Sequence, residues 1–308
     1  MNTVGIIIVV YNQKHFLEGL YKSLQAQSFK DFNIYFIDNA SSDNSLQYSK
    51  VLNGNNKLNI KYFALNKNTG YAGGNNTGAK EAVKDGCKYL FILNNDMILD
   101  KNCINELVKL MESDSSIACA GPLVLFNKQP DTIQEFGGKI NFRSASLKKH
   151  YSGKNIYNIK LPEILETDFI SGGAMFIKSS VFVNAGMFEE AYFAYLDEID
   201  LSKRIKSANA GKLLATSRAV VWHNHNWSKD NKNSFYVEYF LMERNKYLYY
   251  HKYGLYYSMF LMLLNDLFKF PWRLKWFIKV CNFKLGLYYL KGMLYGLLNK
   301  KGKPKFIL

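Results

Sequence analysis

Residues 4–12 read VGIIIVVYN, an apolar run that ends in a tyrosine and an asparagine. Short β-branched runs without polar alternation are typical of strands that are buried on both faces, as in a parallel sheet. We therefore predict a first strand at 5–10. Further strands are predicted at 32–38 (FNIYFID), 59–65 (NIKYFAL) and 88–96 (KYLFILNND).

Helices are predicted between these strands. Apolar residues recur at helical spacing within 11–28, and 75–86 has the pattern of a helix that is closed by a glycine. The order strand, helix, strand, strand, helix, strand predicts an α/β half-domain with a mostly parallel sheet.

Polar residues follow the predicted strands at their carboxyl ends, where ligands bind to sheets of this kind. They are Tyr11 and Asn12, Asp38 and Asn39, and the run Asn94, Asn95 and Asp96. Asp96 is well placed to hold a divalent cation, and Asp38 with Asn39 could bond a nucleobase or a ribose. The alternatives are an ordinary turn at 94–96 and a plain loop with a helix cap after 38.

The glycine-rich segment 66–78 (NKNTGYAGGNNTG) is predicted to be a loop whose backbone could approach a phosphate or a sugar. It lacks the Gly-Lys-Ser/Thr of a phosphate-binding loop, and it does not fit the dinucleotide fingerprint. A flexible loop without a ligand is the alternative.

The middle of the chain mixes helices and strands. We predict a helix at 102–112, a strand at 117–125, a hairpin around Gly137 and Gly138, a helix at about 197–209 and a strand at 213–223. The last strand delivers His223, which with His225 could bind a metal ion. A structural role for these histidines is the alternative. From about 234 the sequence is predicted to be helical to its end.

Three carboxylates, Asp197, Glu198 and Asp200, lie within four positions at the start of the predicted helix. On a helix Asp197 and Asp200 share a face, whereas Glu198 points about 100° away. The helix dipole stabilises negative charge at this end, and one of the three would be a natural general base. A group that only caps the helix is the alternative.

Composition places the protein among folded, basic proteins. The chain has 308 residues, 48% of them hydrophobic, and a net charge of +15. From residue 246 onward twelve Lys or Arg stand against one acid, Asp266. The four cysteines form no zinc-ligand or C-x-x-C pattern, which favours buried reduced thiols in the cytosol. The first residues lack the features of a signal peptide, and no stretch is long and apolar enough to span a membrane.

The basic C-terminal region also carries many aromatic residues. Trp272, Trp276 and Phe277 alternate with Arg273, Lys275 and Lys279. This pattern is typical of a helix that lies in a membrane interface. The alternatives are helices packed on the preceding part of the chain with a solvated basic face, and, without support from any recognition motif, a nucleic-acid-binding surface.

The order of these motifs resembles that of the family 2 glycosyltransferases with a GT-A fold, and in particular the rhamnosyltransferase-like branch of surface-polysaccharide synthesis. The resemblance runs from Val4 to about Asn245. It rests on VGIIIVVYN (4–12), on DNASSDNS (38–45), on NTGYAGGNNTG (68–78), on LNNDM (93–97) and on the segment from Ser171 to Arg204.

The resemblance implies a role for each matched residue. The donor nucleotide would be held by Val10, Tyr11, Asn12, Asp38, Asn39, Asn68, Gly74, Asn75, Asn94 and Asn95. Asp96 and His223 would ligate the metal ion. Glu198 has the aligned position of the base, but because the usual Glu-Asp order is inverted here, Asp197 is the alternative, and Asp200 completes the catalytic group. Arg244 and Asn245 match a late Arg-Asn pair to which the sequence assigns no role.

The expected protein is therefore an α/β GT-A glycosyltransferase, with a Rossmann-like nucleotide-binding half and an acceptor half around one mixed, mostly parallel sheet. The predicted domains are 1–232, divided into 1–100 and 101–232, and a helical, membrane-associating extension at 233–308. It would invert configuration, use Mg²⁺ or Mn²⁺ with a dTDP- or UDP-linked sugar, and act on a lipid-linked or growing glycan. We expect no nucleic-acid partner and a cytoplasmic, peripheral location on an anionic membrane surface. A catalytically idle, nucleotide-sugar-binding scaffold of a glycan assembly complex is the alternative.

Overall fold

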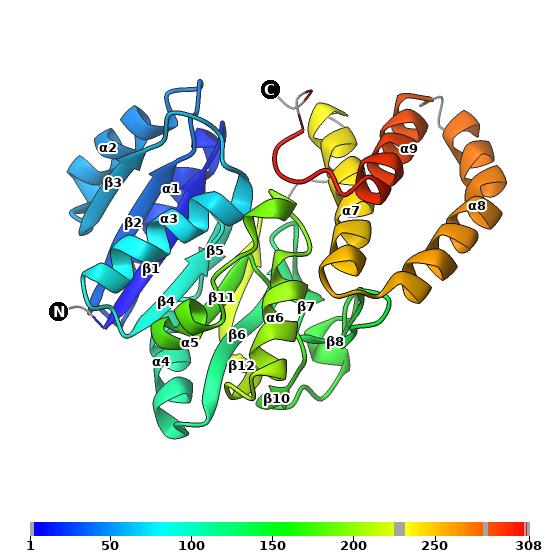
Figure 1. Cartoon of the computed structure of the whole chain (residues 1–308). Coiled ribbons are helices and arrows are strands. Elements are labelled where there is room, and N and C mark those ends of the chain that lie inside the picture. Colours follow the sequence, from blue (N-terminus) through cyan, green and yellow to red (C-terminus); the bar gives the residue numbers. More distant parts are fainter. Residues whose placement is uncertain (1–2, 225–231, 280–282, 305, 307–308) are drawn as a thin grey trace.

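The computed structural model describes residues 3–224, 232–279, 283–304 and 306 (Figure 1). Its centre is a ten-stranded mixed sheet with the order β10-β12-β6-β11-β4-β1-β2-β3, to which β5 and β7 are added beside β12 and β6. The strands of this sheet are β1 (Val4–Val10), β2 (Phe32–Asp38), β3 (Ile60–Ala64), β4 (Tyr89–Leu93), β5 (Met97–Leu99), β6 (Ile117–Phe126), β7 (Gln129–Glu135), β10 (Ile164–Glu166), β11 (Ala174–Lys178) and β12 (Lys212–His223).

The N-terminal half has the predicted parallel arrangement. β1 pairs in parallel with β2 and with β4, and β2 pairs in parallel with β3. Alternate residues of β1 enter two apolar clusters, because Ile6 and Ile8 face one way and Ile7 the other. The helices of this half are α1 (Leu17–Gln25), α2 (Ser45–Asn56), α3 (Gly70–Lys84) and α4 (Cys103–Ser113). Burial of β1 on both faces is thus confirmed.

The second half joins the same sheet through an antiparallel strand. β11 lies between β4 and β6 and runs antiparallel to both. β12 pairs in parallel with β6 and reaches back to β5 with its last residues, Val221 to His223. The helices here are α5 (Ser179–Asn184) and α6 (Asp197–Ser207), with short 3₁₀ turns at Ile156–Asn158 and Glu190–Tyr192; a third such turn, Lys14–Phe16, follows β1 in the N-terminal half.

Three local predictions are wrong. α2 was not predicted, since its sequence SLQYSKVLNGNN has little apolar periodicity. α3 begins at Gly70, so most of the expected glycine-rich loop is helix. There is no hairpin around Gly137, because β7 pairs with β6 while β8 (Gly138–Asn141) pairs with β9 (Ser146–Lys149). Gly137 has a φ of +68° and separates the two sheets.

Three helices complete the chain: α7 (Lys232–Lys252), α8 (Tyr256–Lys279) and α9 (Phe283–Leu297). Gly292 and Gly296 of α9 allow close contact with α7, since a Cβ at these positions would lie 2.6 Å from the Phe240 carbonyl and 2.7 Å from that of Arg244. α8 lies at the outer side of this group (Figure 1). None of the helices within the described residues is long and apolar enough to cross a membrane.

Gly74 illustrates how closely α3 packs on the sheet. A Cβ at this position would lie 2.6 Å from Val9 Cγ1. We expect Gly74→Ala to lower the free energy of unfolding by about 1–3 kcal/mol, because the helix must move away from β1. Gly54→Ala on α2 is the matched control, since nothing lies within 4 Å of its added methyl group. That variant should gain up to about 1 kcal/mol from helix propensity. Equal effects in urea denaturation would contradict the packing argument.

Candidate active site

The ends of β1 and β2 are tied together by polar side chains. Val10 and Asp38 are paired in register, and the Asn39 amide donates to the Val10 carbonyl at 2.8 Å. Beyond β1, Asn12 adopts a left-handed conformation (φ 55°), and its side-chain oxygen accepts from the Ser42 amide at 2.7 Å. Asp38 is buried, and its Oδ1 has no hydrogen-bond partner among the described residues. Such an oxygen is a ready acceptor for a ligand group.

Asn39 and Asn68 hold the start of α3. Asn39 Nδ2 donates to Asn68 Oδ1 at 3.2 Å and to the Gly70 carbonyl at 3.0 Å, and its Oδ1 accepts from the Thr69 amide at 2.8 Å. Asn68 Oδ1 also accepts from the Gly70 amide at 2.8 Å. Asn75 is buried and donates to the Tyr71 carbonyl at 2.9 Å. These predicted donor-site residues therefore organise the first turns of α3 at the edge of the sheet.

Asp96 and His223 approach each other from different strand ends. His223 Nε2 lies 3.2 Å from Asp96 Oδ2, and His223 Nδ1 lies 3.0 Å from Gln134 Oε1. The neighbouring loop is fixed by the Asn94 amide, which donates to the Gly173 carbonyl at 2.9 Å, while Asn95 Nδ2 contacts the Gln13 carbonyl at 3.4 Å. The predicted pair of metal ligands is thus close in space. His225 lies outside the described residues.

This pair fits a divalent cation that is bound together with a diphosphate. A carboxylate and an imidazole converge, and Gln134 can hold the Nδ1–H so that Nε2 is directed at a cation. Within 3–224 and the described parts of the C-terminal helices, no group of three His, Cys, Asp or Glu side chains forms a cation site. Phosphate oxygens and water would have to supply the remaining ligands, as is usual for Mg²⁺.

The acids at the start of α6 differ in exposure. Asp197 is fully buried, and neither of its carboxylate oxygens has a hydrogen-bond partner among the described residues. Glu198 is half-buried. Burial, and then the charge of Glu198, raise the pKa of Asp197 well above its ordinary value. Burial also raises the pKa of Glu198. The negative charge of Glu135, which is paired with Lys149 at 2.6 Å, raises it further.

Tyr71 links these acids to the rest of the site. Its hydroxyl donates to the Gly172 carbonyl at 2.5 Å, next to the glycine that holds Asn94. Burial and the charges of Glu198 and Asp197 raise the pKa of Tyr71 well above its ordinary value, so this hydroxyl stays protonated. The first turn of α3, the Gly172–Gly173 segment and the start of α6 therefore form one continuous region.

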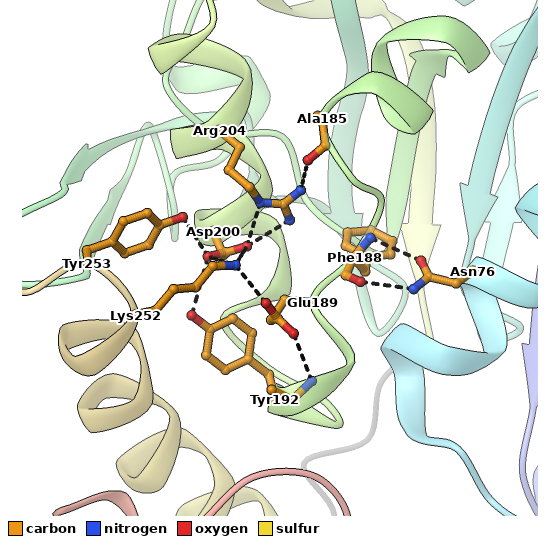
Figure 2. Close-up of polar contacts among 10 residues, drawn as sticks. Asn76, Ala185, Phe188, Glu189, Tyr192, Asp200, Arg204, Lys252 and Tyr253 are labelled. Carbon is orange, nitrogen blue, oxygen red and sulfur yellow. Dashed lines mark hydrogen bonds and ion pairs between the residues drawn. The ribbon is translucent and has the colours of Figure 1, made fainter. Parts of the chain in front are cut away.

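Asp200 points into a network of charged and hydroxyl groups (Figure 2). Its carboxylate accepts from Arg204 Nε at 2.8 Å, from Lys252 Nζ at 3.0 Å and from the Tyr253 hydroxyl at 2.7 Å. The Tyr192 hydroxyl adds a longer contact of 3.3 Å. Asp200 thus ties α6 to α7, and its side chain is fully buried among these partners.

The match to a known family covers β1 to most of α5 and ends before the acids of α6 and His223. Residues 5–182 match the model of the family described as "Glycosyl transferase family 2". The chain belongs to glycosyl transferase family 2. The family resemblance that the sequence motifs indicated is confirmed.

Three curated relatives have informative names. A low-salt glycan biosynthesis hexosyltransferase, Agl10, of Haloferax volcanii is 27% identical over 213 residues, which are 68% of this chain and 63% of that protein. A GalNAc(5)-diNAcBac-PP-undecaprenol beta-1,3-glucosyltransferase of Campylobacter jejuni is 28% identical over 62% of this chain and 57% of its own length. The rhamnosyltransferase WbbL of Escherichia coli is 22% identical over 75% of this chain and 86% of its own length. The chain thus spans less than two thirds of the first two.

Solved structures confirm the predicted fold class. GalNAc-T7 with UDP, GalNAc and Mn²⁺ superimposes with a TM-score of 0.63 at 18% identity over 82% of this chain and 48% of its own. The Pyrobaculum calidifontis mannosyltransferase PcManGT with GDP-Man and Mn²⁺ gives a TM-score of 0.59 at 11% identity over 97% of this chain and 88% of its own. At these identities the likeness concerns the α/β GT-A fold alone.

Several residues of the site were not predicted. Gln134 lies in no motif, and Tyr71 lies inside the 68–78 motif but was assigned no role. The pairing of β7 with β6 and the helical start of α3 bring them to the site. The contacts of Asp200 with Lys252 and Tyr253 join segments about 50 residues apart, and no periodicity in the sequence indicates them.

The unsatisfied carboxylate of Asp197 has a measurable consequence. Folding raises the pKa of this carboxyl. The free energy of unfolding of the protein therefore falls by about 1.4 kcal/mol per pH unit as pH rises from the ordinary pKa to the raised one. We expect Asp197→Asn to raise the melting temperature, and to do so more at about pH 8 than at about pH 5. Asp131→Asn, on the half-exposed part of β7, is the control. A gain that does not change with pH would contradict this account.

Proposed function

We propose that the protein is an inverting, metal-dependent glycosyltransferase that transfers a hexose from a nucleoside diphosphate to a lipid-linked or growing glycan. The observation that carries the proposal is the half-buried Glu198 carboxylate at the start of α6, which has a raised pKa. It is linked through Tyr71 and Gly172 to the strand ends where family members hold their donor. A base with a pKa nearer neutrality is better suited to remove a proton from a hydroxyl group.

In this mechanism the chain's own residues bind the donor and move one proton. The Asp38 carboxylate, with Tyr11 and Asn12 beside it, would receive the nucleoside, while the first turns of α3 border the sugar. Glu198 would take the proton of an acceptor hydroxyl, whose oxygen attacks the anomeric carbon from the face opposite the diphosphate. The bond from that carbon to the phosphate oxygen breaks, and the nucleoside diphosphate leaves. Asp96 and His223 would hold a divalent cation, which when bound neutralises the departing diphosphate.

Glu198 is a better candidate for the base than Asp197 because only a partly exposed carboxylate can reach an acceptor. Asp197 is fully buried and would not contact the acceptor, and Asp200 would keep α6 attached to α7 through its ionic partners. For the donor we keep UDP- or dTDP-linked sugars, with rhamnose supported only by the likeness to WbbL. A lipid-linked acceptor is supported by the name of the Campylobacter relative. The division at residues 100 and 232 stays a prediction.

The test combines binding and transfer. We expect one of UDP, dTDP and GDP to bind in calorimetry with Mn²⁺ and far more weakly without it, and Asp96→Asn to remove this difference. Glu198→Gln should keep that binding but lower the transfer rate at least about 100-fold, because the proton then has no acceptor. In wild-type protein, activity should fall as pH falls through a midpoint above the ordinary Glu value of 4.5.

Glu163→Gln is the matched control, since it alters an exposed carboxylate that is paired only with Arg218. Transfer that persists in Glu198→Gln while Asp197→Asn is inactive would move the role of base to Asp197. Folded wild-type protein that binds no nucleotide diphosphate would overturn the enzyme assignment, and binding without transfer to any acceptor would favour the scaffold.

We also propose that α8 attaches the protein to an anionic membrane surface. Its exposed large side chains fall on one stripe: Tyr257, Phe260, Leu261, Leu264, Leu267, Phe268 and Trp272, each at least 46% exposed. The opposite side of the helix carries Asp266, which is buried and bonded to Arg273. Lys269 and Lys275 are exposed near the stripe. An apolar helix face with lysines at its border fits the interface of an anionic bilayer. The side chains of Trp276, Phe277 and Lys279 lie outside the described ones.

Flotation with vesicles tests this surface. Wild-type protein should float with vesicles that contain phosphatidylglycerol, and the double variant Leu264→Asp, Phe268→Asp should not, because both changes place charge on the apolar stripe. Val51→Asp is the control, since Val51 is an exposed apolar residue of α2 (59% exposed) far from α8 in the chain. Continued flotation of the double variant would show that α8 is not the attachment surface.

A further inference from the structure

The turn that leads into α6 has a strained backbone conformation. Phe193, Tyr195 and Leu196 all have positive φ angles, of 68°, 68° and 71°. This conformation favours glycine, yet none of the three is a glycine, and each is a bulky residue. Leu196 directly precedes Asp197, the first residue of the helix. Such a turn persists only where its surroundings hold it, and strained turns of this kind are concentrated at functional sites.

Asn245 and Arg244 of α7 are the residues that hold it. The side-chain amide nitrogen of Asn245 lies within donating distance of three carbonyls of the turn, those of Tyr192 (3.1 Å), Ala194 (2.7 Å) and Tyr195 (2.9 Å). Asn245 is fully buried. All of its side-chain donor contacts with described residues go to this turn, rather than to α7 or to its packing partners.

Arg244 supports both Asn245 and the turn. Its Nε and one terminal nitrogen donate to Asn245 Oδ1 at 3.0 and 2.8 Å, and that terminal nitrogen also donates to the Tyr192 carbonyl at 2.7 Å. The other reaches the Gly302 carbonyl at 2.5 Å. Arg244 is 1% exposed, and the nearby negative charge of Asp197 favours its charged form, although burial lowers its pKa overall. Burial of a guanidinium is expensive, and the bonds to the Tyr192 and Gly302 carbonyls, together with the nearby charge of Asp197, offset this cost.

The turn itself connects the two sides of the site. The Phe193 carbonyl accepts from the Ala72 amide at 3.3 Å, and it lies where a Cβ of Gly70 would be, at 2.1 Å. The Phe193 ring packs with Phe240 and Leu241 of α7. The start of α3, the turn and α7 are thus in direct contact immediately before the acids of α6.

We infer that Asn245 and Arg244 are positioning residues, which hold the Tyr192–Leu196 turn in its strained conformation and thereby place Asp197 and Glu198 for catalysis. The catalytic half of this inference rests on the proposed function. Both residues are buried and bond to the backbone of the turn. Their effect passes through the backbone of the turn to the start of α6.

Asn245→Asp is the sharpest test, because it keeps the size of the side chain and the oxygen that Arg244 contacts but removes the amide donors. Tyr247→Phe is the matched control, since it removes a buried hydrogen bond of the same helix, 3.1 Å to Asp266, that does not involve the turn. Two quantities are measured in the full-length protein: hydrogen exchange of the Phe193, Ala194 and Asp200 amides, which are hydrogen-bonded in the native turn, and the kinetics of transfer.

In Asn245→Asp we expect faster exchange at these three amides and a kcat lower by about 100-fold, the effect of a small misplacement of a catalytic group. KM for the donor and nucleotide binding should stay near their wild-type values, because Asp38 and Asp96 lie on other segments. Tyr247→Phe should lower the melting temperature without changing kcat or the exchange of the turn.

Unchanged exchange in the turn would overturn the inference, whatever the activity. A kcat that falls in both variants in proportion to their melting temperatures would also overturn it, since only general stability would then be involved. Wild-type protein without transferase activity would refute the proposed function instead, and the exchange result would still decide whether Asn245 and Arg244 hold the turn.

Discussion

The burial of β1 on both faces is the constraint on which the rest of the structure depends. Ile6 and Ile8 need a cover on one side and Ile7 on the other, so the chain must place helices on both faces of the sheet. Parallel neighbours then end at the same edge as β1. At that edge the hydrogen bonds between strands end, so the backbone N–H and C=O groups beyond it need other partners. Asn12, Asn39 and Asp38 meet this need, and Asp38 Oδ1 remains an acceptor for a ligand.

At the start of α6 two electrostatic effects oppose each other. The helix N-terminus stabilises a carboxylate by typically 0.3–1 kcal/mol, up to about 2 kcal/mol when partly buried. Removing a carboxylate from water costs several kcal/mol, even after relaxation. Burial therefore prevails, and the pKa values of Asp197 and Glu198 are both raised. In contrast, Asp200, only one helical turn away, receives donors from Arg204, Lys252 and Tyr253. The same short segment thus provides one carboxylate that accepts several hydrogen bonds and two whose pKa values are raised.

The sequence predicts the features that depend on local pattern. The apolar runs at 5–10 and 32–38 mark the parallel strands, and the ends of the predicted strands mark the residues that gather at the edge, including Asp96 and His223. It does not predict features that arise from long-range contacts. Gly70 begins a helix because Asn39 and Asn68 bind its backbone, although the surrounding glycines resemble a loop. Likewise β8 pairs with β9 and not with β7, and no pattern within 132–142 indicates this pairing.

The role of α7 explains why the last part of the chain cannot be understood as an appendage. One side of α7 supplies Asn245 and Lys252 to the turn and to Asp200, next to the acids. The other side packs on α9 through Gly292 and Gly296 and bonds to α8 through Tyr247 and Asp266. A helix with buried polar contacts on both sides has little freedom to shift, because any movement leaves donors or acceptors unpaired. The surface formed by α8 and the acids of α6 are therefore held in a fixed relation by one helix. If the protein acts as proposed on an acceptor in a membrane surface, this relation would let the reacting hydroxyl reach Glu198 at a set distance from that surface.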